Sequence, residues 1–220
     1  MMKRISSVIL AAVMLLTLTM CAPKDEVTVH IAALKGPTGI GMAAMMGEEP
    51  AVQSSGDYQF SIVAAPDEIV GKITSGEIDI AAVPTNLAAV LYKKTGGGVQ
   101  LAALNTLGVL YIVDTTGTVQ SVEDMRGKTV YATGQGSNPE YVLSYILREN
   151  GLEPGVDVTV EYRAEHAELA TMLASGLAEI GMLPEPNVTS VLSKNSAAEA
   201  ALDLTDEWNN VTEDGSVLTM

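Results

Sequence analysis

Ser75-Gly76-Glu77-Ile78-Asp79-Ile80-Ala81-Ala82-Val83-Pro84-Thr85-Asn86 is the stretch that decides the fold. A helix that begins at Pro66 should stop at Gly76, and the apolar run 79–83 has the character of a buried strand. Pro84-Thr85-Asn86 then turns directly into another helix, which ends near Gly96. Further strands are predicted at 27–34 and 58–64, the first followed by a Gly-rich turn and a helix from about Ile40. This alternation predicts a mostly parallel sheet with helices on both faces.

The same series recurs 100 residues later in the chain. Matched pairs are Gly36/Gly136, Ala64/Ala164, Glu68/Glu168, Ser75-Gly76/Ser175-Gly176, Ile80/Ile180, Pro84/Pro184 and Lys94/Lys194. These identities are sparse, but they agree without a gap with the order of the predicted elements. They predict two α/β lobes of the same Rossmann-like architecture. The alternative, that βα units merely share turn chemistry, stays open.

The predicted lobes divide the chain into consecutive segments. Residues 27–110 form lobe 1, residues 111–205 form lobe 2, and residues 206–220 cross back towards lobe 1. The apolar segment 101–114 is expected to be an extended strand between the lobes, and strands are also predicted at 200–204 and 216–220. Because an apolar strand is a poor place for a chain to stop, we expect either that the natural protein continues or that the open reading frame is truncated.

Composition excludes several classes of function. Of 220 residues, 47% are hydrophobic and only 4% aromatic, so the core must be built from aliphatic side chains. The net charge of −15 repels phosphate backbones, which argues against a nucleic-acid partner. The single cysteine, Cys21, permits no disulfide within the chain, and no metal spacing or cofactor motif is found. Gly134-x-Gly136-x-x-Pro139 lacks the third glycine of a dinucleotide fingerprint.

The N-terminus predicts export. Met1-Met2-Lys3-Arg4 is basic, and the apolar run 5–20 is too short for a comfortable membrane span, so residues 1–20 are predicted to be a signal peptide. Leu18-Thr19-Met20-Cys21 resembles a bacterial lipobox, with Met20 where a small residue is usual. We therefore expect lipidation of Cys21, a tether over 21–26 and an extracytoplasmic, membrane-anchored protein. A plain secretory signal is the alternative.

Four predicted βα turns supply the candidate site. Ligands of open α/β sheets bind beyond the carboxyl ends of the strands, where glycine lets the backbone approach and helix N-termini offer free N–H groups. If the two lobes face each other, all four turns converge. The predicted ligand-binding residues are Lys35, Gly36, Thr38, Gly39, Thr85, Asn86, Asn105, Gly136, Ser137, Asn138 and Glu185. Ser, Thr and Asn are also ordinary helix caps. Lys35 with Glu185 could do acid/base work, form a latch between the lobes or supply a charge partner for the ligand.

The segments 34–41, 76–86, 139–143 and 183–186 resemble the nitrate/sulfonate/taurine-type substrate-binding proteins of ABC importers, and the related pyrimidine-precursor binders. The resemblance implies a periplasmic-binding-protein-like type II fold, with two crossover strands and a ligand cleft between the lobes. It also implies a receptor that passes a small polar or anionic solute to ABC permease and ATPase subunits. Family members usually run about a hundred residues longer. The alternative is an enzyme on this fold, chorismate-dehydratase-like or pyrimidine-synthase-like, which would be cytoplasmic.

Overall fold

The computed structural model describes residues 27–47, 57–63, 66–213 and 215–219. The predicted signal peptide, the tether and Cys21 therefore lie outside the described residues. Within these ranges, no helix is long and apolar enough to cross a membrane.

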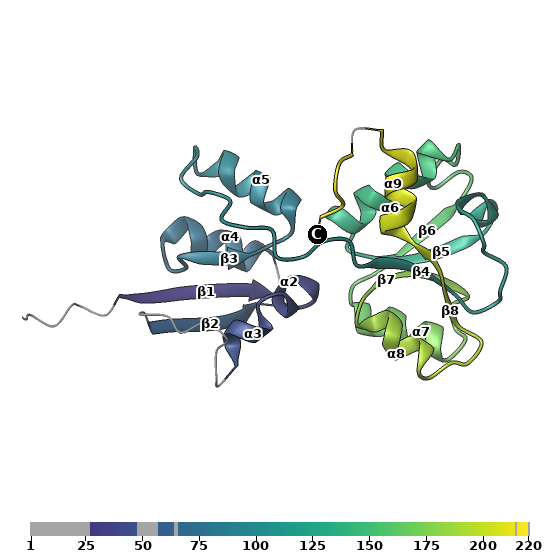
Figure 1. Cartoon of the computed structure of the whole chain (residues 1–220), viewed down its shortest axis with the longest axis horizontal. Coiled ribbons are helices and arrows are strands. Elements are labelled where there is room, and N and C mark those ends of the chain that lie inside the picture. The colour runs from purple at the N-terminus through teal and green to yellow at the C-terminus, as the bar shows by residue number, and fades with distance from the viewer. Residues whose placement is uncertain (1–26, 48–56, 64–65, 214, 220) are drawn as a thin grey trace, which may run out of the picture.

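Lobe 1 is built on a three-stranded parallel sheet with the order β2-β1-β3 (Figure 1). Its strands are β1 (Thr28–Leu34), β2 (Asp57–Val63) and β3 (Ile80–Ala82). Its helices are α2 (Pro37–Ile40), α3 (Ala43–Met46), α4 (Pro66–Ser75) and α5 (Thr85–Lys94). These elements follow the predicted order. The helix expected from Ile40 instead begins at Pro37, where the fixed φ of proline suits a first helical turn, and it divides into α2 and α3.

Lobe 2 is built on a five-stranded sheet with the order β6-β5-β7-β4-β8. Its strands are β4 (Leu110–Asp114), β5 (Thr129–Thr133), β6 (Thr159–Arg163), β7 (Ile180–Pro184) and β8 (Glu199–Asp203). Its helices are the 3₁₀ turn η1 (Val122–Met125), α6 (Asn138–Glu149), α7 (His166–Ala174), α8 (Asn187–Leu192) and α9 (Leu204–Val211). Because β4 runs antiparallel to both β7 and β8, the sheet is mixed rather than parallel throughout.

The two lobes share their strand order. β2-β1-β3 in lobe 1 corresponds to β6-β5-β7 in lobe 2, parallel in both cases. The helix ends match as well: Gly76 and Gly176 both have φ of 74°, the left-handed conformation that glycine adopts without strain. Around them, Glu77 N donates to Lys72 O at 2.9 Å and Leu177 N to Met172 O at 2.8 Å. The 100-residue spacing therefore corresponds to turns of the same conformation after α4 and after α7.

The hydrophobic core is concentrated in lobe 2. Helices α6 and α9 cover one face of its sheet and α7 and α8 the other (Figure 1). The interior strand β4, between β7 and β8, alternates between these faces, with Ile112 in one cluster and Val113 in the other, both fully buried. Burying one such side chain stabilises the fold by about 1.5–3 kcal/mol. Lobe 1 has two smaller clusters, one on each side of β1, around Leu34 and Ile31.

Two segments differ from the sequence prediction. Of the expected crossing strand 101–114, only β4 is a strand, and the chain before it is irregular apart from a bridge between Leu107 and Thr219. The expected crossover 206–220 instead begins within helix α9, where the Asp203 side chain caps the helix by accepting from Thr205 N at 2.8 Å. The α9 residue Trp208 packs against the lobe 2 core, which provides the burial that an extended crossover would lack.

Candidate functional site: the contact between the lobes

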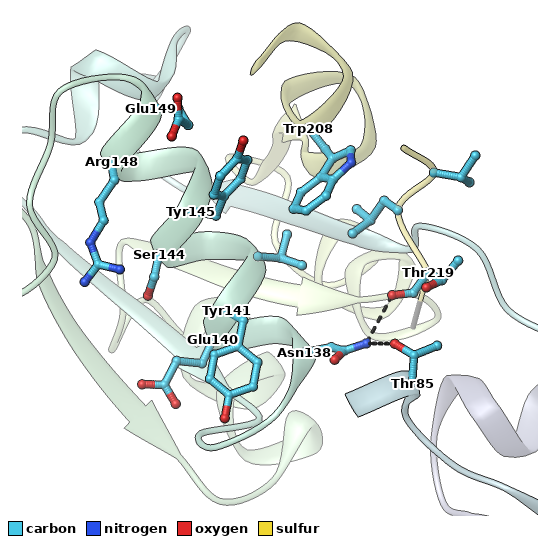
Figure 2. A pocket seen from close by; sticks show the side chains of 13 residues that line it. Thr85, Asn138, Glu140, Tyr141, Ser144, Tyr145, Arg148, Glu149, Trp208 and Thr219 are labelled. Atoms are coloured by element: carbon cyan, nitrogen blue, oxygen red, sulfur yellow. Dashed lines mark hydrogen bonds between the residues drawn. The ribbon is translucent and has the colours of Figure 1, made fainter. Parts of the chain in front are cut away.

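The lobes meet where α5 and α6 begin. The side chain of Asn138, only 9% exposed, donates from Nδ2 to the hydroxyl of Thr85 in the other lobe (Figure 2). The same nitrogen donates to the carbonyl of Thr219 at 3.2 Å. Pro84 precedes α5 and Pro139 is the second residue of α6, so both helix starts are held in place by the sequence. Two predicted ligand-binding residues are therefore brought together, and they contact each other across the lobes.

A second contact between lobes involves a histidine. The His166 ring lies close to Gly36, where a methyl group on the glycine would be 4.0 Å from Nε2. Its Nδ1 is hydrogen-bonded to the Thr133 hydroxyl at 2.6 Å, which orients the ring. Burial lowers the pKa of His166, and the neighbouring Glu165 carboxylate opposes this shift. Sequence reasoning gave His166 no role, although its position at the start of a helix after β6 was a usable signal.

Asn86, the second residue of α5, has an unsatisfied polar atom. Its Oδ1 is buried, and among the described residues it is the buried side-chain atom that lacks a hydrogen-bond partner. Leaving a buried acceptor unpaired costs about 1–3 kcal/mol. A donor group from a molecule held beside Asn86 would remove that cost, so this atom is chemically suited to ligand contact.

Other predicted residues are committed to local structure. Thr38 donates to Leu34 O at 3.3 Å, and Ser137 donates to Gly134 O at 2.8 Å. Glu185 accepts from both the backbone N and the hydroxyl of Thr189, at 3.2 Å and 2.9 Å. Only the Glu185 contact, which accepts from a backbone N–H in the first turn of α8, resembles the capping role that the sequence left as the alternative. Thr38 and Ser137 donate to carbonyl groups of their own turns and do not cap a helix with their side chains. Gly39 has a packing role, because a Cβ there would lie 2.7 Å from Leu34 O.

The remaining predicted residues separate into three situations. Asn105 is exposed and donates to Thr38 O at 3.0 Å, so it supports the first turn of lobe 1 instead of lying on a cleft floor. Gly136 donates its N–H to the Glu140 carboxylate at 2.5 Å. Lys35 is exposed, and no salt bridge joins it to Glu185 within the described ranges. The Lys35–Glu185 latch is therefore not formed, and the Thr85–Asn138 contact joins the lobes.

A pocket of about 720 Å³ extends from the Thr85–Asn138 contact along α6 (Figure 2). Thr85 and Asn138 are the predicted ligand-binding residues among those that line it. The others, which sequence reasoning missed, are Glu140, Tyr141, Val142, Ser144, Tyr145, Arg148, Glu149, Trp208, Val217, Leu218 and Thr219. They come from α6, α9 and the segment after α9, and only the packing of α9 on α6 brings them together. No group of three or more potential metal-ligating side chains occurs in the described ranges.

Two α/β lobes with the same strand order and βα turns at their contact are the architecture of periplasmic-binding-protein-like proteins. The chain belongs to the family of periplasmic substrate-binding proteins of phosphonate ABC transporters, whose model matches residues 43–218. No functionally curated protein matches the sequence.

Solved structures agree with this fold. An ABC transporter protein from Parabacteroides distasonis is 27% identical with a TM-score of 0.67, over 81% of this chain and 59% of that chain. The periplasmic aliphatic sulphonate-binding protein SsuA from Escherichia coli is 18% identical, with a TM-score of 0.63, over 83% and 62%. The periplasmic nitrate-binding protein NrtA from Synechocystis is also 18% identical, with a TM-score of 0.54, over 77% and 50%. The chain thus spans about three fifths of the length of the first two structures.

The family confirms the leading hypothesis drawn from the sequence, a substrate-binding component of an ABC transporter. The family consists of periplasmic substrate-binding proteins, the SsuA and NrtA structures are described as periplasmic binding proteins, and none of these is described as an enzyme. The enzyme alternative therefore receives no support from the comparisons. The solute itself does not follow from the fold, because the sulphonate- and nitrate-binding relatives share the fold at low identity.

Proposed function

We propose that this chain captures a small oxyanion-bearing solute between its lobes, outside the cytoplasm, and delivers it to the permease of an ABC importer. The observation that carries the proposal is the apposition of two helix starts from different lobes, α5 and α6, through Thr85 and Asn138. Helix N-termini carry unsatisfied N–H groups and a partial positive charge, which favour an anionic group. Phosphonate, sulphonate and nitrate, the groups named for the family and its structural neighbours, are all oxyanions.

We assign the solute contacts to Thr85, Asn86, Asn138 and His166. Asn138 Nδ2 now donates to the Thr85 hydroxyl, and a solute oxyanion entering between the lobes would accept from the amide and from the hydroxyl in place of this bond. Asn86 Oδ1 offers an unpaired acceptor for a hydroxyl or amine of the same solute. His166 presents its ring beside the Gly36 turn. Glycine at position 36 leaves room for close approach of a ligand to the backbone.

The test is a thermal-shift screen with the full chain. Solutes that carry a phosphonate, sulphonate, nitrate or carboxylate group are compared with uncharged analogues of the same size. A ligand that binds only the folded protein raises the melting temperature by mass action, by an amount equivalent to about 2.7 kcal/mol at a concentration 100 times Kd. Stabilisation by no oxyanion, or equal stabilisation by the uncharged analogues, would refute the assignment of solute class.

Membrane anchoring through lipidated Cys21 is part of the same proposal. It is supported by the order of a basic stretch, an apolar stretch and a cysteine in residues 1–21. Mass spectrometry of the protein purified from host membranes should show an N-terminal, lipid-modified Cys21. A mature N-terminus elsewhere with an unmodified Cys21 would refute the anchor while leaving secretion intact.

A further inference from the structure

The outer face of α6 is unusually aromatic for a helix that covers a sheet. Tyr141, Tyr145 and Glu149 recur at every fourth residue, so they form one line along the helix. Tyr141 is 54% exposed and Tyr145 is 36% exposed, whereas Leu143 and Leu147 on the inner face are fully buried. The sheet therefore needs only the inner face, and the packing of α6 on the sheet does not account for the aromatic line.

Helix α9 places a third aromatic residue opposite this line. The rings of Trp208 and Tyr145 have centroids 5.1 Å apart and are tilted by 46°, and Figure 2 shows them facing each other. Trp208 Nε1 donates to Ser216 O at 3.1 Å, which fixes the indole, and the part of its ring that is not packed on the core lines the hollow beside Tyr145. Two adjacent hollows of about 720 and 480 Å³ share Tyr145, Glu149 and Trp208, and together they form the α6–α9 groove.

The charges around the α6–α9 groove are unbalanced. Arg148 is paired with Glu153 at 3.1 Å, so the groove's cation is already neutralised. Glu149 and Glu213 line the second hollow, and neither makes a salt bridge or side-chain hydrogen bond with another described residue. Aromatic faces with carboxylates beside them attract alkylammonium and guanidinium groups through cation–π and ionic attraction. The groove is thus complementary in charge and shape to a basic side chain.

We propose that the α6–α9 groove docks a basic segment of a partner protein, with a Lys or Arg side chain held at Tyr145 and Trp208 between Glu149 and Glu213. The groove is open to solvent, and Val217 on its rim is 63% exposed, which suits an extended segment better than an enclosed small cation. Aromatic residues gathered with exposed apolar rims are typical of protein interfaces. This surface is separate from the proposed solute contacts except where its end reaches Thr85 and Asn138.

Trp208 is the only tryptophan, so intrinsic fluorescence reports directly on this groove. The probe is the peptide acetyl-Gly-Arg-Leu-Arg-Gly-amide, titrated into the full chain at low salt, with the citrulline analogue as the neutral control. We expect a saturable change in Trp208 emission with the arginine peptide only. The E149Q/E213Q variant should weaken binding about threefold to tenfold, as expected for two exposed ionic contacts. The E168Q/E179Q variant has the same net charge but is altered at exposed sites near α7, and should bind within about twofold of wild type.

Four results would overturn the proposal. Equal binding of the citrulline peptide would remove the role of charge, and equal weakening by both double variants would reduce the effect to net charge. Binding of free arginine amide as tight as that of the peptide would make the groove a small-cation site. A concentration-dependent emission change without peptide, accompanied by dimers in sedimentation, would place a second copy in the groove. None of these measurements includes the solute, so they are independent of the proposed transport function.

Discussion

Replacing Asn138 with alanine tests the centre of the proposed solute site. The carboxamide nitrogen of Asn138 offers two protons, and they are donated to the Thr85 hydroxyl and the Thr219 carbonyl. A solute oxyanion that accepts from Asn138 must therefore displace a neutral hydrogen bond. The net gain is the difference between a bond to a charged group, about 1.5–3 kcal/mol, and a neutral one, about 0.5–1.5 kcal/mol.

That difference, about 1–1.5 kcal/mol, predicts that Asn138→Ala raises the solute Kd about fivefold to tenfold. Isothermal titration calorimetry with a solute identified by the thermal-shift screen measures the change. Ser144→Ala is the matched control, because Ser144 lies on the same helix and lines the same pocket but lies away from the Thr85 contact. Wild-type affinity in an Asn138→Ala protein that is folded by circular dichroism would refute the role given to Asn138.

Three further predictions concern the solute, acidity and the repeated turn. Asn86→Leu should weaken solute binding in calorimetry while circular dichroism stays unchanged, and unchanged affinity would remove Asn86 from the site. Burial holds the pKa of His166 below its ordinary 6.5, so the unfolded chain takes up a proton more readily and stability falls as pH drops below about 6.5. The melting temperature of His166→Gln should fall less steeply with decreasing pH in that range than that of the wild type. The same slope of melting temperature against pH in both proteins would contradict this. Gly76→Ala and Gly176→Ala should each destabilise by about 1 kcal/mol in urea melts, because both have φ of 74° and open space for a methyl group. Clearly unequal costs would show that the two turns are not equivalent.

The sequence by itself determined the local order of elements in both lobes. Gly76 and Gly176 end their helices because glycine adopts a positive φ without strain, and proline marks the start of α2 and α5 because its ring fixes φ, whatever surrounds these residues. The 100-residue repeat predicted the same order of strands and helices in both lobes, and the shared strand order confirms this common architecture. The family resemblance was also readable from the residues of these turns, and the match over residues 43–218 bears it out.

Tertiary structure alone decided which polar groups remain available for a ligand. A short polar residue at a helix start looks the same in sequence whether its side chain donates to its own turn, as Thr38 and Ser137 do, or reaches the other lobe, as Asn138 does. The aromatic groove depends on Trp208 packing against Tyr145, a contact between residues far apart in the chain. The local sequence pattern indicates the backbone conformation that a few neighbouring residues prefer. Hydrogen-bond partners and burial depend instead on which segments, far apart in the chain, pack against each other.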